Sequence, residues 1–400
     1  MASARTVIIA GAGIGGLTAA LSLAKRDLIS LVLEQADRLE EAGAGLQLAP
    51  NATRILIDLG LRPLIERTAL VPQAIRVMSA RFAREVVRIP LGAAVEARYG
   101  APYWIMHRAD LQAALAEAVR GRQEITLKLD ARVEDFAVHS NGVTVQWRSA
   151  GQVGDDTGIA LVGADGIWSS VRARLRRDPA PKFRNRTAWR ALVPTESVIP
   201  EFREPLVHLW LGQDAHVVHY PVKGGALINI VVIVQDQWRQ QGWTSAGESE
   251  ELLRHFSRWD WAQAPRDLLS LPERWQKWAL FDRPRPHRGG RGPVTLLGDA
   301  AHPMLPFLAQ GAGTAIEDGP VLADALANNL ERPTRALRRY ERTRRPRTTK
   351  VQRASRRQAR IYGMSGPEGY LRNLFMRARG GDSLLKRYDW LYNWRPPTKP

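Results

Sequence analysis

Residues 5–27, "RTVIIAGAGIGGLTAALSLAKRD", decide the fold of this 400-residue chain. Residues 7–9 are a continuous apolar run, as expected for a strand that is buried on both faces. Three glycines come next with the spacing G-x-G-x-x-G, namely Gly11, Gly13 and Gly16. Apolar residues then recur at helical spacing, so the stretch predicts a strand, a tight glycine turn and a helix. This order is typical of the first unit of an α/β fold with a parallel sheet.

A second strand and an acidic residue complete the pattern. Residues 29–35, "ISLVLEQ", form another apolar strand ending at Glu34, about 20 residues beyond the glycines, as in dinucleotide-binding units. Gly11 would allow the tight turn, Gly13 would let the backbone approach a pyrophosphate, and Gly16 would let the helix pack on the strand. The helix N-terminus would offer N–H groups to the anion, and Glu34 would accept hydrogen bonds from ribose hydroxyls. The stretch therefore predicts a dinucleotide site.

The segment after the second strand favours FAD over NAD. An NAD dehydrogenase would continue with alternating strands and helices, whereas residues 40–61, "EEAGAGLQLAPNATRILIDLGL", predict a glycine-rich loop and then a helix. Farther on, Arg108 stands just before Asp110, which we expect to cap an apolar helix. An arginine at a helix start is well placed for a phosphate, and pairing with a local acid is the alternative for Arg108.

The rest of the chain leaves the nucleotide fold and returns to it. Residues 125–147 predict a strand meander, and residues 158–175 predict a strand that ends at Asp165, with a helix after it. Asp165 is then either a cofactor ligand or a simple turn residue. The segment 180–280 is β-rich with Trp-rich helices after residue 237, and it predicts an inserted antiparallel sheet. The buried strand in "GPVTLLGDAAH", residues 292–302, is the return.

The stretch "GDAAHPMLPFLAQGAG", residues 298–313, first suggests a hydrolase or metal site at Asp299 and His302. The sequence holds no G-x-S-x-G and no H-E-x-x-H motif, and its lack of cysteine excludes disulfides and thiolate ligands. Residues 314–330 predict a helix with an apolar stripe. Its N-terminus would present backbone N–H groups to a ligand, so we interpret the stretch as part of a cofactor cradle and expect no metal site.

The ordered set of motifs resembles the three fingerprints of the FAD-dependent aromatic hydroxylases, the class A flavoprotein monooxygenases. The three are "GAGIGG" with Glu34, "GADG" at 163–166 and "GDAAHPMLPFLAQGAGTAIEDG" at 298–319. Shorter motifs are similar to the single-component salicylate hydroxylase and 3-hydroxybenzoate 6-hydroxylase branch: "PNA" at 50–52, "HRADL" at 107–111 and "HYPV" at 219–222. The resemblance extends through "DWLY" at 389–392, nearly the whole chain.

The resemblance implies a tightly bound, non-covalent FAD. The cofactor-binding residues that it implies are Gly11, Gly13, Gly16, Glu34, Gln47, Arg108, Asp165, Asp299, Pro306, Gly311, Ala312 and Gly313. In such enzymes the residue matching Asp299 binds the ribityl chain, and residues 311–313 lie under the flavin pyrimidine. A helix N-terminus there would stabilise the anionic reduced flavin. His302 takes the place of a structural histidine beside the cofactor.

The resemblance also implies hydroxylation of a small phenolic or heteroaromatic, carboxylate-bearing substrate. NADH or NADPH, a transient co-substrate, would reduce FAD, and O2 would form a flavin C4a-hydroperoxide that the ring attacks. In "HVVHYP", residues 216–221, strand alternation places His216 and Tyr220 on one face and His219 on the other. We expect His216 to titrate near neutrality as the base, Tyr220 to be its hydrogen-bonding partner and His219 to have a packing role.

Three further residues are candidates for substrate contact. Gln310 matches a glutamine that orients the substrate beside the flavin, and Gln47 lies in a loop that approaches the flavin. Gln47 argues against a hydroxynicotinate-type substrate, because those relatives carry a histidine there. Arg190, in "AWRALVP", either binds a substrate carboxylate or pairs within the sheet.

The expected fold is α/β: a Rossmann-like FAD-binding domain of the glutathione-reductase and p-hydroxybenzoate-hydroxylase type with an inserted antiparallel-sheet substrate domain and C-terminal helices. The FAD-binding domain is predicted at 1–72, 104–180 and 282–345. The substrate domain is predicted at 73–103 and 181–281, and the helical region at 346–400. Other flavin enzymes of this fold, such as prenyl reductases or halogenases, are the rival function, although the halogenase motif W-x-W-x-I-P is missing.

Most of the net charge of +18 sits in one segment. Residues 335–360 hold twelve Lys or Arg and one Glu, a net of +11 that leaves +7 for the other residues. The segment predicts a helix that kinks at Pro346. A solvated or acid-paired face, steering of an anionic substrate and peripheral contact with an acidic membrane are the alternatives for it. Nucleic-acid binding is not expected, since no binding module accompanies the charge. A basic scaffold that keeps FAD as structure is the rival from another class. With no apolar run of membrane-spanning length, we expect a cytoplasmic protein, and a homodimer is open.

Overall fold

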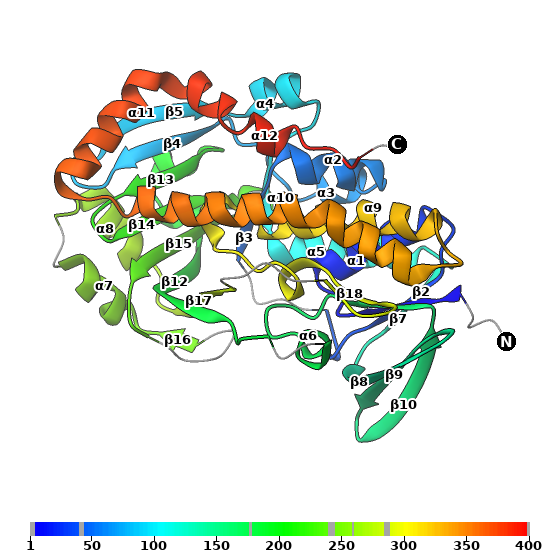
Figure 1. The fold of residues 1–400 in the computed structure, drawn as a ribbon. Helices are drawn as coiled ribbons and strands as arrows, with labels where there is room; N and C mark the ends of the chain where they lie inside the picture. Colours follow the sequence, from blue (N-terminus) through cyan, green and yellow to red (C-terminus); the bar gives the residue numbers. More distant parts are fainter. Residues whose placement is uncertain are drawn as a thin grey trace.

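A computed structural model describes residues 5–39, 44–175, 178–238, 245–257, 260–283 and 289–397. A parallel sheet with its helices forms one side of the molecule, and a second, larger sheet forms the other (Figure 1). The long helix α10, Pro333–Tyr362, runs along both parts (Figure 1). This arrangement confirms the predicted α/β fold class.

The parallel sheet has five strands in the order β18-β11-β1-β2-β7. Their bounds are β1 Val7–Ala10, β2 Ser30–Leu33, β7 Ile125–Lys128, β11 Ala160–Gly163 and β18 Val294–Leu296. Because β1 is central, Ile9 packs into the core on one face and Ile8 into a separate core on the other. The predicted meander is wrong at its start, since β7 joins this sheet in parallel with β2. An antiparallel sheet comes after it: β8 Arg132–His139, β9 Gly142–Ser149 and β10 Gln152–Gly158.

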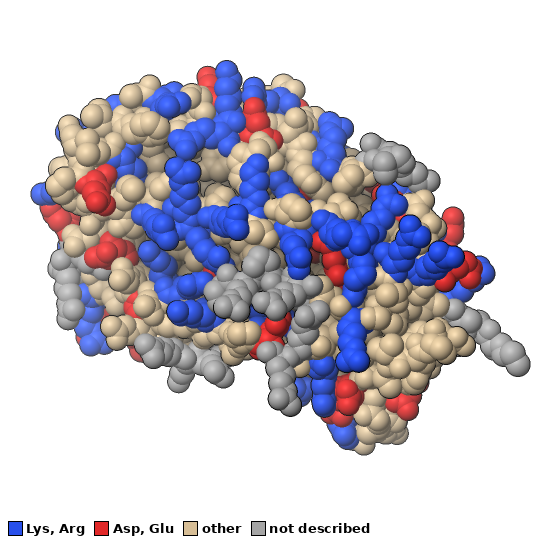
Figure 2. Space-filling view, viewed as in Figure 1, with Lys and Arg blue, Asp and Glu red and all other residues tan. Residues whose placement is uncertain are grey.

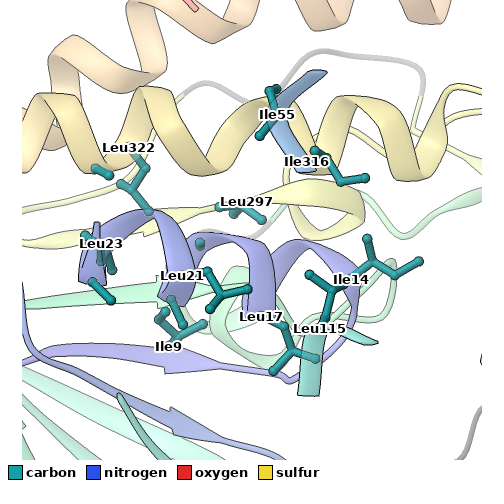
Figure 3. Packing of buried hydrophobic residues seen from close by; sticks show 14 of the residues in the cluster. Ile9, Ile14, Leu17, Leu21, Leu23, Ile55, Leu115, Leu297, Ile316 and Leu322 are labelled. Atoms are coloured by element: carbon teal, nitrogen blue, oxygen red, sulfur yellow. The ribbon is translucent and has the colours of Figure 1, made fainter. Parts of the chain in front are cut away.

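Helices α1, Ile14–Ala24, and α5, Arg108–Arg120, pack on strands of the parallel sheet, and α9, Gly311–Ala327, packs on α1. Leu17 of α1 and Ile316 and Leu322 of α9 belong to the same buried cluster, which Figure 3 shows on both sides of α1, with Leu322 between the two helices. The predicted helix after the 298–313 loop is therefore confirmed, and it packs directly on the helix of the glycine turn. This contact brings two segments about three hundred residues apart to the same edge of the sheet, where ligands bind in open α/β folds.

The second sheet has eight strands in the order β16-β17-β12-β15-β14-β13-β4-β5. Their bounds are β4 Ala74–Ser79, β5 Arg84–Pro90, β12 Lys182–Pro194, β13 Val207–Leu211, β14 Ala215–Val222, β15 Leu227–Gln235, β16 Ser245–Gly247 and β17 Trp275–Asp282. All neighbours are antiparallel except β13 and β4, which pair in parallel. The two-stranded sheet of β3, Gly45–Leu48, and β6, Trp104–His107, packs beside it through contacts of β6 with β14.

The remaining helices lie outside these sheets. They are α2 Pro50–Asp58, α3 Arg62–Ile65, α4 Gly92–Tyr99, α6 Ser170–Leu175, α7 Ser249–Ser257, α8 Gln263–Ser270, α11 Gly366–Lys386 and α12 Asp389–Tyr392. Part of the predicted Trp-rich segment, residues 239–244 and 258–259, lies outside the described residues. No described helix combines the length and apolar character needed to cross a bilayer.

Helix α10 is a single helix of 30 residues that continues through Pro346. The predicted domain limit between residues 345 and 346 falls inside it, so a boundary there would divide a continuous helix. The domain limits stay a prediction, which the membership of residues 74–90 in the eight-stranded sheet supports. One side of α10 is buried, and it carries arginines as well as apolar residues: Ala336, Leu337, Tyr340, Arg344, Arg347, Val351 and Ala359.

His208 and His219 stack inside the eight-stranded sheet. Their ring centroids are 4.4 Å apart with an interplanar angle of 3°, and Phe202 packs against both. Neither ring nitrogen of His219 has a hydrogen-bonding partner among the described residues. Burial, reinforced for each ring by neighbouring positive charge, lowers the pKa of His208 to about 3 and that of His219 well below its usual value. The packing role expected for His219 thus agrees with its surroundings.

We expect this histidine pair to make the fold sensitive to acid. When the pKa of a histidine is lower in the folded than in the unfolded protein, the unfolded protein takes up a proton first as the pH falls. The free energy of unfolding therefore decreases below the unfolded pKa. Stability should therefore fall as pH drops below the unfolded pKa of 6.5 and continue to fall toward the folded value of about 3. In His219→Phe, which sacrifices no hydrogen bond, the unfolding free energy lost between pH 7 and pH 5 should be smaller by about 2 kcal/mol. Urea unfolding at both pH values measures this. Exposed His139→Gln is the control, and an equal loss in His219→Phe and wild type would contradict the assignment.

Candidate active site

Two glycines of the glycine turn leave no room for a side chain, whereas the third has free space beside it. Gly11 has φ +105°, and a Cβ there would lie 2.6 Å from the Ala164 carbonyl oxygen. A Cβ on Gly16 would lie 2.0 Å from the Gly11 carbonyl oxygen, so the fold itself requires these two glycines. A Cβ on Gly13, the N-cap of α1, would meet no described atom within 4 Å. Gly13 therefore leaves free space at a helix N-terminus, where an anion is stabilised.

Glu34 has a structural role that the sequence did not reveal. Its carboxylate accepts hydrogen bonds from the backbone N–H of Ala12, at 2.7 Å, and of Ala36, at 2.9 Å. These bonds join the end of β2 to the glycine turn. A carboxylate has about four acceptor positions, so the predicted contact with ribose hydroxyls remains open to Glu34.

Asp165 is both a helix cap and a free acceptor. One oxygen accepts hydrogen bonds from the Ser170 hydroxyl and the Val171 N–H at the start of α6, each at 3.1 Å. The other oxygen, Oδ1, is buried and has no partner among the described residues. A buried acceptor without a donor is costly, so Asp165 is suited to a hydroxyl or N–H group of a ligand.

Arg108 and Asp299 lie close enough for their charges to interact. Arg108 is the first residue of α5 and Asp110 lies within the first turn, so the prediction that Asp110 caps this helix is wrong: His107 is the cap. Asp110 instead pairs with Lys223. Desolvation raises the pKa of Asp299 against the opposing charges of His302 and Arg108. Its side chain is nevertheless exposed to solvent.

The loop 298–313 is held by side chains of α9 and α10. Asp318 accepts hydrogen bonds from the Gly298 N–H, at 2.9 Å, and shares one of 2.7 Å with His302. From α10, Gln352 donates to the Pro303 carbonyl, at 2.8 Å, and Ser355 to the Leu305 carbonyl, at 2.6 Å. His302 therefore has a structural partner, consistent with the role that the family resemblance implies.

The centre of this framework is a buried charge cluster of Glu317, Asp318, Arg344 and Arg347. Arg344 donates to Asp318, at 2.6 Å, and to Glu317, at 2.9 Å, while Arg347 donates to Glu317 at 2.7 and 3.1 Å. The two acids are fully buried and the two arginines are nearly so. Desolvation opposes the ionisation of Asp318, but His302 and Arg344 together hold its pKa below the usual value. Sequence reasoning missed this cluster. The sequence signal that could have revealed it is a pair of acids inside the apolar helix α9. It is accompanied by two arginines, three residues apart, on the buried side of α10.

Gln310 is the N-cap of α9 and is buried. Its Oε1 accepts a hydrogen bond of 2.9 Å from Asn51 Nδ2, and Asn51 donates a second bond of 2.7 Å to Glu317. Ala309, just before Gln310, has φ +50°, a left-handed conformation that is unusual for a residue other than glycine. Next to them, a Cβ on Gly311 would meet no described atom within 4 Å. The half-buried Pro306 begins the turn of helix that leads to Gln310.

The eight-stranded sheet brings three candidate residues to one face. His216 is opposite Ile233 and Tyr220 is opposite Asn229 in the pairing of β14 with β15, and Arg190 of β12 is opposite Val231. Directly opposite residues share a face, and so do alternate residues along a strand. His216, Tyr220 and Arg190 therefore lie on the same face, as predicted for the first two. The His216 ring contacts Phe307 of the loop, at 5.3 Å between centroids, and Tyr362 at the end of α10, at 5.1 Å.

Tyr220 lies beside Gln47. Gln47 is also the acceptor of a 2.8 Å hydrogen bond from the hydroxyl of Tyr103, a residue that sequence reasoning did not select. Desolvation raises the pKa of Tyr220 above its usual value, although the charge of Arg190 and a hydrogen bond with Gln47 oppose the shift. A Cβ on Gly45 would come within 2.8 Å of both Tyr220 and Asn229, so this glycine permits the close approach of the 44–48 loop to the sheet.

Arg190 has no carboxylate partner among the described residues. Its guanidinium lies over the Trp278 ring, 4.7 Å from the centroid, and its Nε is buried without an acceptor. Desolvation, together with the charge of Arg108, lowers its pKa to about 10. The alternative expected for Arg190, pairing with an acid within the sheet, is not seen among the described residues. A guanidinium in such surroundings attracts an anion.

These features fit FAD. Free space lies beside Gly13, in the turn after β1, and beside Gly311, at the start of α9. The unsatisfied oxygen of Asp165 lies after β11, and the exposed side chain of Asp299 lies after β18. A protein-family model described as an FAD binding domain matches residues 4–355. Curated relatives cover nearly the full length. One is a 3-hydroxybenzoate 6-hydroxylase of Aquipseudomonas alcaligenes, 35% identical over 96% of this chain and 97% of the relative. The chain belongs to the FAD-dependent aromatic hydroxylases.

Another curated relative and two solved structures agree with this chain in length or fold. A 3-amino-4-hydroxybenzoate 2-monooxygenase of Streptomyces platensis is 38% identical over 97% of this chain and 96% of the relative. A salicylate hydroxylase solved as a substrate complex has 27% identity and a TM-score of 0.81, and the match covers 98% of this chain and 96% of that one. HpxO of Klebsiella pneumoniae, solved with FAD and uric acid, shares the fold with a TM-score of 0.83 at 24% identity over 96% and 95%.

Two alanine substitutions should separate the folding role of the glycine turn from its binding role. We expect Gly16→Ala to lower the melting temperature of the FAD-free protein, because its Cβ collides with the Gly11 backbone. Gly13→Ala should leave that temperature within roughly 2 °C, since it adds no clash, yet weaken FAD binding at least about tenfold by filling the space of the pyrophosphate. Fluorescence quenching of FAD measures binding. Unchanged affinity in Gly13→Ala would show that FAD binds elsewhere.

Proposed function

We propose that this FAD-dependent aromatic hydroxylase uses NAD(P)H and O2 to hydroxylate a benzenoid acid that carries a ring hydroxyl, a compound of the hydroxybenzoate class. One observation carries the proposal. A histidine, a tyrosine and an arginine without a carboxylate partner among the described residues share one face of the eight-stranded sheet, against the loop that leads to Gln310 and Gly311. When bound, FAD supplies hydride acceptance from NAD(P)H and the activation of O2.

His216 acts as a neutral hydrogen-bond acceptor for the substrate hydroxyl. Burial, with a smaller effect of the Arg186 charge, lowers the pKa of His216 to about 3, which differs from the near-neutral titration expected from the sequence. A neutral imidazole accepts the phenolic proton, and the resulting imidazolium is stable only while the phenolate stays beside it. The proton therefore moves only within the closed site. Phe307 and Tyr362, which contact the His216 ring, keep water from it.

Tyr220, Gln47 and Arg190 orient the ring. Tyr220 and Gln47 lie side by side and hold the substrate on the sheet side, and Gln310 holds it on the cofactor side. Arg190 binds the carboxylate, because a desolvated guanidinium gains a charge-assisted hydrogen bond from it. Together Tyr220, Gln47, Gln310 and Arg190 would present one ring carbon to a flavin held by residues 311–313.

The exposed side of α10 steers anions toward the site. Figure 2 shows Lys and Arg side chains gathered over this helix. The exposed ones are Arg335, Arg339, Arg342, Arg345, Lys350, Arg353, Arg357 and Arg360. Both the aromatic acid and NAD(P)H are anions, so this positive field raises their local concentration. Contact with an acidic membrane, a homodimer and a cytoplasmic location stay predictions, as does the choice between NADH and NADPH.

His216→Ala should keep FAD bound but lower coupled hydroxylation by roughly 100-fold. The assay follows NADH and NADPH oxidation across a panel of hydroxybenzoates and hydroxypyridines and scores hydroxylated product against hydrogen peroxide. Wild-type activity should show no step near pH 6.5, because His216 remains neutral there. Exposed His139→Ala is the control.

Unchanged coupling in His216→Ala would remove this residue from the reaction. No NAD(P)H oxidation with any phenol, together with salt-sensitive binding to lipid or nucleic acid, would favour the scaffold function. Reduction of an isoprenoid double bond without O2 would favour a prenyl-reductase-like enzyme.

Arg190→Met should raise KM for the carboxylate-bearing substrate roughly 10- to 100-fold, the cost of one charge-assisted hydrogen bond. The corresponding phenol without a carboxylate should have the same KM in both proteins, since it offers Arg190 no anion. Steady-state kinetics on the matched pair of substrates measures this, with exposed Arg274→Met as the control. An equal rise for both substrates would mean that Arg190 supports the sheet rather than the carboxylate.

A further inference from the structure

A chain of three buried side chains links the charge cluster to the loop 298–313, the flavin loop of the proposed function: Glu317, Asn51 and Gln310. We propose that Glu317 and Asn51 are positioning residues that determine which end of the Gln310 amide faces the substrate. The inference rests on the proposed function, in which Gln310 contacts the aromatic acid, and it specifies the chemistry of that contact.

Glu317 can only accept hydrogen bonds. Its Oε1 accepts from Arg347 and Asn51, each at 2.7 Å, and its Oε2 accepts from Arg344, at 2.9 Å, and Arg347, at 3.1 Å. Guanidinium groups have donors and no acceptors, so a proton on Glu317 would have no acceptor among these arginines. The carboxylate therefore presents only acceptors to these groups, one of them to Asn51.

The acceptor of Glu317 fixes the orientation of Asn51. Only the amide nitrogen of asparagine donates, so Nδ2 must point to Glu317, and it makes that bond at 2.7 Å. The second hydrogen of the same nitrogen goes to Gln310, at 2.9 Å. Asn51 is fully buried, and a flipped amide would place its oxygen against the Glu317 carboxylate. Such a flip costs a buried hydrogen bond and adds a repulsion.

Asn51 in turn fixes the orientation of Gln310. Because Asn51 donates, Gln310 must present Oε1 to it, and its Nε2 then lies at the other end of the amide. Nε2 makes no hydrogen bond to a described residue, although Gln310 is buried. A Cβ on Gly313 would lie 2.9 Å from Gln310 Oε1, so this glycine leaves the space in which the oxygen sits.

Gln310 is therefore a hydrogen-bond donor toward the substrate. The atom that it contacts is an acceptor oxygen, either the ring oxygen as it loses its proton or a carboxylate oxygen. An N–H group at that place would meet another N–H. The arrangement selects against donors at one position of the ring, and the selection originates in Glu317, whose side chain lies behind Asn51.

A double-mutant cycle on substrate affinity tests the relay. The FAD-loaded protein is titrated with 3-hydroxybenzoate and salicylate without NAD(P)H, and the change in the flavin absorption spectrum gives Kd. Asn51→Asp can only accept from Gln310, which must turn its oxygen to the substrate. We expect about tenfold weaker binding in Asn51→Asp and in Gln310→Met, about the energy of one buried hydrogen bond. The double variant should be no weaker than Gln310→Met alone.

Two further variants complete the design. Asn51→Ala releases Gln310 without adding charge, so it should give an intermediate loss of affinity and none in the Gln310→Met background, even if Asn51→Asp folds poorly. Asn328→Asp makes the same chemical change at the exposed end of α9 and should leave Kd unchanged. Multiplicative losses in the double variants, or wild-type affinity in Asn51→Asp, would overturn the relay. Non-additive binding without hydroxylation would instead count against the proposed function alone.

Discussion

The pairing of Glu317 and Asp318 with Arg344 and Arg347 is the interaction on which the rest of the site depends. Replacing a buried ion pair by apolar residues often costs no stability, so the value of such a cluster lies in the geometry that it imposes. Here each of the two acids also organises a neighbour. Asp318 holds the backbone at Gly298 and the ring of His302, and Glu317 holds Asn51. The buried charge cluster therefore fixes the position of the loop 298–313.

Helix α10 connects this cluster to both halves of the molecule. Its buried arginines reach α9, its Gln352 and Ser355 hold the carbonyls of the flavin loop, and its end places Tyr362 against His216. Arg347 also donates to the carbonyls of Trp390 and Leu391, which ties the C-terminal segment to the same point. Its exposed face is almost wholly basic. One helix therefore combines a rigid support on its buried side with an attraction for anions on its outer side.

Sequence reasoning succeeded where chemistry depends on local order and failed where it depends on surroundings. The alternation of β14 correctly placed His216 and Tyr220 on one face, because period two is a property of the strand itself. The expected pKa of His216 was wrong, because the low value comes from burial against distant segments and from the charge of Arg186. Asp110 was expected as a cap because the helix start was set three residues late. Tyr103, Asn229 and the charge cluster were missed, since each acts through a partner far away in the chain.

The sequence by itself determined the glycine turn, the strand that precedes it, the helix after the flavin loop and the family to which the chain belongs. These are encoded by spacing within short windows, where steric limits and periodic burial leave few alternatives. Only the tertiary structure decided that Glu317 lies behind Asn51, that Arg190 lacks a carboxylate among the described residues, and that His216 is kept neutral. Protonation, hydrogen-bond direction and desolvation depend on which groups meet in space, and no local window of sequence specifies those meetings.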